Sequence, residues 1–144
     1  MAVNISCEYL GDLHVRAVHG PSGHVIVTDA PVDNHGKGEG FSPTDLAATA
    51  MATCFLTILG IHARNTGLDL RGAHASVAKH MTTTPPRRIA KLEVDITMPP
   101  GVPLEVRDRL IRAAEACPVK HSFHPDTEIV LNWKWRSQVI AAGG

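Results

Sequence analysis

The sequence has few aromatic residues, few cysteines and no excess of charge of either sign. Aromatic side chains make up 4% of the 144 residues, and 14 basic residues balance 14 acidic ones. Nucleic-acid binding depends on clustered Lys and Arg that displace counterions, or on aromatic rings that stack on bases. We therefore expect no nucleic-acid partner. Three cysteines cannot all pair within one chain, so a secreted disulfide scaffold is not expected either.

The beginning of the sequence also lacks the features of a secretory signal. Its first ten residues include Asn4 and Glu8, and no basic stretch is followed by an apolar run. We therefore expect a cytoplasmic protein. One uncharged stretch, residues 46–63, approaches the length of a membrane span. Because threonines, alanines, a glycine and a histidine dilute its hydrophobicity, a buried core helix is favoured, and no membrane partner is expected.

Hydrophobic periodicity predicts the secondary structure. Alternation of apolar and polar residues, bounded by turn residues, predicts strands over residues 3–9, 13–18, 24–29, 68–81, 89–98 and 129–135. Ser42, Pro43 and Asp45 predict a helix start, with Ser as N-cap, Pro at the first position and an acid three residues after the cap. This helix is expected to end near residue 65. A second helix is expected from Pro103 to just before Pro118.

This order of elements predicts one α+β domain over residues 1–144, with an antiparallel sheet of about six strands, a long buried helix and a second helix. One sheet covers one face of a helix, whereas the long helix is apolar on every side. We therefore expect a homodimer in which two long helices pack together between two sheets. Small residues allow the close approach: Ala47, Ala48, Ala50 and Ala52.

The three cysteines occupy different positions in these elements. Cys7 shares a strand face with apolar residues and is expected in the core. Cys54 lies midway along the long helix, where core packing and reactive chemistry are both open. Cys117 closes the second helix, and the negative end of a helix dipole disfavours a thiolate. Cys117 therefore suits the resolution of an oxidised partner better than attack.

Two motifs around the cysteines stand out. The first is Gly-Glu-Gly-Phe-Ser-Pro-Thr-Asp-Leu at residues 38–46, followed by an Ala-rich helix with Cys54 eight residues after Leu46. The second is Ala-Ala-Glu-Ala-Cys-Pro-Val around Cys117. Together they resemble the OsmC and organic hydroperoxide resistance superfamily, and the likeness extends from about Tyr9 to Trp135. It implies an intertwined homodimer that reduces hydroperoxides in defence against oxidative stress.

The resemblance also implies roles for two cysteines. Cys54 is the peroxidatic residue, whose thiolate attacks the hydroperoxide and becomes a sulfenic acid, and Cys117 resolves this acid to a disulfide. An external dithiol, such as a lipoylated protein in related members, then restores both thiols. No bound cofactor and no metal ligand are expected.

The sequence departs from the family pattern around the nucleophile. Well-studied members activate the thiolate with an Arg held by a Glu, and the Glu position is Thr44 here. Asp45 is adjacent but is expected to cap the helix. The Arg position aligns near Leu13, and Arg16 is the nearest candidate. A binding module or redox sensor for a small hydrophobic ligand is therefore the alternative to an efficient peroxidase.

Histidines suggest a rival chemistry near Cys117. The spacing of Cys117, His121 and His124 is compatible with metal ligation. His121 could instead modulate the pKa of the thiols, or it could be an ordinary surface residue. We expect no metal, because three such residues in a loop between two prolines are a weak signal.

Overall fold

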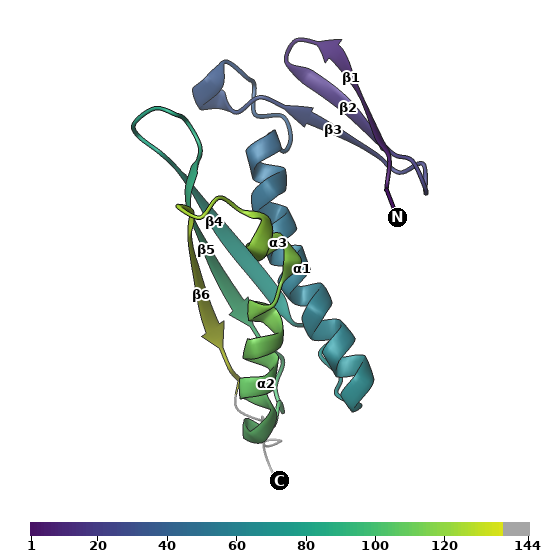
Figure 1. Cartoon of the computed structure of the whole chain (residues 1–144), viewed down its shortest axis with the longest axis vertical. Coiled ribbons are helices and arrows are strands. Elements are labelled where there is room, and N and C mark those ends of the chain that lie inside the picture. The colour runs from purple at the N-terminus through teal and green to yellow at the C-terminus, as the bar shows by residue number, and fades with distance from the viewer. Residues whose placement is uncertain (137–144) are drawn as a thin grey trace, which may run out of the picture. The chain divides into compact units, whose positions relative to one another are not determined.

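A computed structural model describes residues 1–136 of the chain (Figure 1). Residues 137–144, the end of the predicted domain, lie outside the described residues. The chain forms two compact units, residues 1–47 (unit 1) and the residues from Ala48 onward (unit 2), which are described separately. The elements are β1 (Ile5–Gly11), β2 (His14–His19), β3 (Val25–Asp29), the 3-10 turn η1 (Val32–Asn34), α1 (Pro43–Thr66), β4 (His74–Met81), β5 (Ile89–Thr97), α2 (Leu104–Glu115), α3 (Pro118–Ser122) and β6 (Glu128–Lys134).

Unit 1 is built on an antiparallel meander in the order β1-β2-β3, as the turn residues predict. Many apolar side chains of this sheet are exposed, including Ile5 at 63% and Tyr9 at 64%. Cys7 is exposed as well. Its predicted place in the core is wrong for this chain. Alternation identifies an apolar face of a strand but does not specify what covers that face.

Unit 2 contains the second sheet, in the order β4-β5-β6. The α+β fold class is confirmed, but the strands form two three-stranded sheets in place of one larger sheet. β4 and β5 are antiparallel, whereas β6 runs parallel to β5. The parallel pairing follows from the connection between β5 and β6, because α2 and α3 carry the chain back to the start of the sheet.

The core of unit 2 is centred on β5. Leu92, Val94 and Ile96 are fully buried, and polar residues alternate with them, as predicted. From α2, Leu110 and Ala114 are also fully buried. Since β5 pairs on both sides, its backbone groups are bonded while one face is packed.

The ends of α1 are as the sequence predicts. The Ser42 hydroxyl accepts a hydrogen bond from the Asp45 N–H at 3.1 Å, and the Asp45 carboxylate accepts one from the Ser42 N–H at 2.9 Å. This reciprocal pair is a capping box. Pro43 is the first helical residue, and Gly67, at φ +74°, follows the end.

One stripe of α1 is buried, and the opposite side is exposed in the single chain. The buried stripe recurs at helical spacing and consists of Ala48, Met51, Ala52, Phe55, Leu59 and Ala63. Thr53, Thr57 and Ile61 are exposed. Burial on every side is therefore not found in the single chain. By length and composition α1 could also cross a membrane, but the core helix of a soluble protein passes the same test.

The second predicted helix is α2, and a further short helix that was not predicted follows it. α2 ends at Glu115, and Pro118 begins the short helix α3 inside the predicted loop between two prolines. The break occurs because Cys117 has an extended ψ of 123° and serves as the N-cap of α3. Proline favours the first helical position, so Pro118 starts a new helix instead of only ending the previous one.

Candidate functional site: a pair of thiols

Two cysteines that are far apart in the sequence meet in unit 2. Cys54 lies on α1 and is half-buried, whereas Cys117 lies between α2 and α3 and is fully buried. Cys54 lies close enough to Cys117 to influence the pKa of its thiol. The structure thus brings together the two cysteines that the sequence motifs single out.

The surroundings of Cys117 keep its thiol protonated. Burial raises the pKa of Cys117, and the hydrogen bond with Cys54 and negative charge on Cys54 raise it further. The N–H groups of Lys120 and Val119 lower the pKa in part, and the Lys120 N–H donates to the Cys117 Sγ at 3.4 Å. Burial and the neighbouring Cys54 are thus the principal causes of the raised pKa of Cys117. From the sequence, the negative end of a helix dipole is the expected reason that its thiolate is disfavoured.

This pair is chemically asymmetric. Only a thiolate is a good nucleophile, and the raised pKa of Cys117 disfavours its thiolate. Negative charge on Cys54 makes the Cys117 S–H a donor toward it. Cys54 is also the more accessible of the two. The arrangement therefore favours reaction at Cys54 first, followed by exchange with Cys117.

The other predicted supporting residues are placed elsewhere in the chain. Thr44 and Asp45 lie in unit 1 at the start of α1, where the Thr44 hydroxyl is 3.3 Å from that of Ser42. Arg16 is an exposed residue of β2, paired in the sheet with Glu8. These three residues therefore belong to unit 1, whereas the two thiols belong to unit 2.

His121 is exposed on α3. The thiol of Cys117 and the rings of His121 and His124 do not form a metal-type cluster among residues 1–136. The cluster found in this part of the chain consists of His14, Asp29 and Glu39 in unit 1. Sequence reasoning missed it, because its members come from two strands and a loop and share no local spacing.

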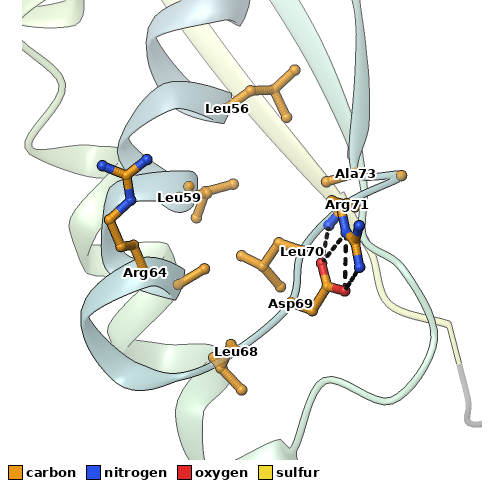
Figure 2. Close-up of a pocket in the computed structure, with 11 residues that line it drawn as sticks. Leu56, Leu59, Arg64, Leu68, Asp69, Leu70, Arg71 and Ala73 are labelled. Carbon is orange, nitrogen blue, oxygen red and sulfur yellow. Dashed lines mark hydrogen bonds and ion pairs between the residues drawn. The ribbon is translucent and has the colours of Figure 1, made fainter.

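An apolar cavity of about 490 Å³ lies in unit 2 beside the last turns of α1 (Figure 2). The side chains of Leu56, Leu59 and Leu70 line it, and neither cysteine does. At its rim, Arg71 holds the pKa of Asp69 at about 2 through hydrogen bonds of 2.8–3.1 Å. The cavity is thus distinct from the thiol pair in its lining residues.

Comparison with known proteins identifies the family. The model of the OsmC-like protein family matches residues 36–132, more than half of the chain. The chain belongs to the OsmC-like family. The family model spans both the Gly-rich segment before α1 and the region around Cys117, which carry the resemblance seen in the sequence.

Solved structures share the OsmC-like fold over nearly the whole chain. A Psychrobacter arcticus protein, provisionally described as an osmotic stress induced and detoxification response protein, is 41% identical with a TM-score of 0.85, covering 94% of this chain and 97% of that one. An organic hydroperoxide resistance protein OsmC from Legionella pneumophila is 15% identical with a TM-score of 0.73, covering 93% and 97%. The organic hydroperoxide resistance protein OhrB of Bacillus subtilis is 15% identical with a TM-score of 0.68, and the match covers 93% of this chain and 98% of that one. No curated protein matches.

Proposed function

We propose that this OsmC-like protein is a thiol peroxidase that reduces hydroperoxides, organic ones in particular, in defence against oxidative stress. The observation that carries the proposal is the proximity of Cys54 to the buried Cys117, which shows in the raised pKa of Cys117. The descriptions of the related structures point in the same direction, toward detoxification and organic hydroperoxide resistance.

The proposed reaction has two steps. The Cys54 thiolate attacks the distal oxygen of a hydroperoxide ROOH, the O–O bond breaks, and the RO⁻ that leaves is protonated to an alcohol. Cys54 is thereby oxidised to a sulfenic acid. The Cys117 sulfur then attacks the Cys54 sulfur, which forms a disulfide and releases water. The proximity of Cys54 to Cys117 supports this second step.

An external dithiol completes the cycle. Its two thiols exchange with the Cys54–Cys117 disulfide, so that the enzyme returns to two thiols and the reductant becomes a disulfide. A lipoylated protein is the proposed reductant, and no bound cofactor takes part in this cycle. We place the cycle in the cytoplasm, where thiols are kept reduced.

The proposed assembly is a homodimer. The exposed side of α1 carries small residues, including Ala50, Thr53 and Gly60, which allow two helices to approach closely. Apolar residues on β1, such as Ile5 and Tyr9, are also exposed in the single chain. A second copy would remove these surfaces from water. Supporting roles for Arg16, Thr44, Asp45 and His121 in activating Cys54 stay predictions.

Turnover of cumene hydroperoxide with dihydrolipoamide tests the proposal. Cys54→Ser is expected to reduce the rate to that of the uncatalysed reaction, because the nucleophile is lost. Without added dithiol, Cys117→Ser should consume one hydroperoxide per chain and stop at the sulfenic acid. Cys7→Ser is the matched control and should keep the wild-type rate, since Cys7 lies in unit 1 and is exposed. Undiminished turnover by a folded Cys54→Ser variant would overturn the proposal.

A second candidate function is the binding of a small hydrophobic ligand. Leucines of α1 line a cavity of about 490 Å³. This volume falls in the size range of ligand-binding sites. If the protein is a binding module, Cys54→Ser should leave its affinity for an apolar fluorescent probe unchanged. Leu59→Trp, which places a larger side chain in the cavity, should lower that affinity. Probe binding without any peroxide turnover in the wild-type protein would favour this function.

A further inference from the structure

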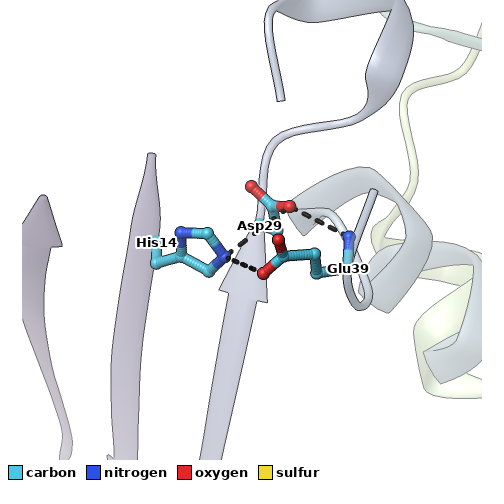
Figure 3. A group of neighbouring side chains, drawn as sticks. All are labelled: His14, Asp29 and Glu39. Carbon is cyan, nitrogen blue, oxygen red and sulfur yellow. Dashed lines mark hydrogen bonds and ion pairs between the residues drawn. The ribbon is translucent and has the colours of Figure 1, made fainter. Parts of the chain in front are cut away.

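An imidazole and two carboxylates converge in unit 1, which does not contain the reactive pair (Figure 3). His14 comes from the start of β2, Asp29 from the end of β3, and Glu39 from the loop before α1. The His14 Nε2 is 3.3 Å from Glu39 Oε2 and 3.6 Å from Asp29 Oδ2. Each of the three residues offers one atom that could bind a metal ion, and these three atoms lie within 4.8 Å of one another.

The hydrogen bonding of His14 shows which ring nitrogen carries a proton. Nδ1 lies 2.7 Å from the backbone carbonyl oxygen of Asp12, which can only accept a hydrogen bond. Nδ1 is therefore the donor, and in a neutral imidazole the Nε2 lone pair faces the two carboxylates. These three acceptors repel one another unless a cation lies among them or a proton on Nε2 makes the ring a donor to both carboxylates. A backbone carbonyl that fixes the far ring nitrogen is also the usual partner of a metal-binding histidine.

Asp29 provides a second, independent observation. Its side chain is 1% exposed, and its Oδ1 has no hydrogen-bond partner. Its Oδ2 accepts the Glu39 N–H at 3.0 Å. A buried carboxylate oxygen without a partner is costly. A cation bound by this carboxylate would offset that cost.

The two distances measured from His14 Nε2 match those of a tetrahedral zinc site. Zn–N and Zn–O bonds of about 2.0–2.2 Å place neighbouring ligand atoms about 3.4 Å apart, close to the 3.3 and 3.6 Å measured from His14 Nε2. A formal charge of −2 on the carboxylates matches a divalent ion, and an imidazole ligand favours transition metals over Mg²⁺ or Ca²⁺. The Glu39 side chain is 58% exposed, which leaves the site open to an entering ion.

The neighbouring ammonium group of Lys37 is bonded outside the cluster. The ammonium of Lys37 is bonded to the Asp12 carboxylate at 2.7 Å, and it acts on Asp29 and Glu39 only through its field. From these observations we propose that His14, Asp29 and Glu39 bind one divalent transition-metal ion, Zn²⁺ or an ion of similar preference, with a fourth position left for water. The competing explanation is a protonated His14 held by two carboxylates.

Zn²⁺ titration followed by calorimetry tests this site. Because thiols bind zinc, the parent is the chain with Cys7, Cys54 and Cys117 all changed to serine. One Zn²⁺ per chain is expected. Glu39→Gln should weaken binding at least about tenfold, because it removes one ligand, and the exposed side chain can be exchanged without opening the core. Glu8→Gln and His24→Gln, which change exposed residues of the same unit, are matched controls and should bind as the parent does.

Two results would overturn the proposal. The first is equal Zn²⁺ affinity of the parent and its Glu39→Gln variant. The second is no Zn²⁺ binding by the parent, together with nitrogen NMR shifts that show both ring nitrogens of His14 protonated at neutral pH. If the triple serine variant does not fold, the same comparison is made in the wild-type background, where Glu39→Gln should bind one Zn²⁺ fewer per chain.

Discussion

Strands β1 and β5 have the same alternating pattern but different surroundings. In β5, Leu92 and Ile96 are fully buried within the single chain. In β1, Ile5 and Tyr9 are more than 60% exposed. In both units the alternating pattern therefore identifies a strand with one apolar face. Whether that face is buried depends on other elements of the fold, which the sequence of the strand does not specify.

The cysteines differ between the two units in the same way. Cys7 is exposed on β1, whereas Cys117 is buried beside Cys54 in unit 2. Burial and a neighbouring thiol change the chemistry of Cys117, as the direction of its pKa shows. Position in the fold, more than residue type, thus separates a reactive pair from an isolated thiol.

Replacing one isoleucine in each strand should give the largest difference between the units. Ile96→Ala is expected to lower the free energy of unfolding by about 2–5 kcal/mol, because it leaves a cavity in a packed core. Ile5→Ala should cost less than about 0.5 kcal/mol at low protein concentration, as for most surface substitutions. Urea unfolding at two protein concentrations measures both.

Protein concentration separates packing within the chain from packing between copies. If a second copy covers β1, the effect of Ile5→Ala should grow as the concentration rises, whereas that of Ile96→Ala should stay the same. Equal losses for the two variants at every concentration would contradict the difference between the units.

Alkylation rates should show a smaller but specific difference between the thiols. Iodoacetamide is expected to modify Cys7 at least about tenfold faster than Cys117 near pH 8, because Cys117 is buried and the raised pKa reduces its thiolate fraction. The rate at Cys117 should rise only at a pH above the usual range of a thiol. Mass spectrometry of the modified peptides measures each rate.

The variant Cys54→Ser sharpens this prediction. It removes the neighbouring thiol that raises the pKa of Cys117, so the alkylation profile of Cys117 should move to lower pH. Cys7→Ser is the control and should leave that profile unchanged. A profile that stays in place in Cys54→Ser would show that burial alone determines the shift.

Much of the fold could be predicted because local signals determine it. The capping box of Ser42 and Asp45 and the glycine after Thr66 identify α1 from start to end. The division into two sheets could not be predicted, since strand pairing depends on contacts between distant segments. The start of α3 was missed because a proline after Cys117 is compatible with both a helix end and a new helix.

The two candidate sites differ in how far the sequence predicts them. Cys54 and Cys117 lie in motifs with a family resemblance, and the structure places them close together, while their roles stay predictions. His14, Asp29 and Glu39 come from separate segments, each with an ordinary local explanation as a polar strand or loop residue. Only the return of β3 beside β2 places Asp29 opposite His14.

Peptide mapping after oxidation tests the central claim most directly. One equivalent of cumene hydroperoxide should consume two thiols per chain and produce a peptide that joins Cys54 to Cys117, while Cys7 stays free. Dihydrolipoamide should reverse the change. A Cys54 that remains reduced under excess peroxide, in protein with an intact fold, would contradict the account.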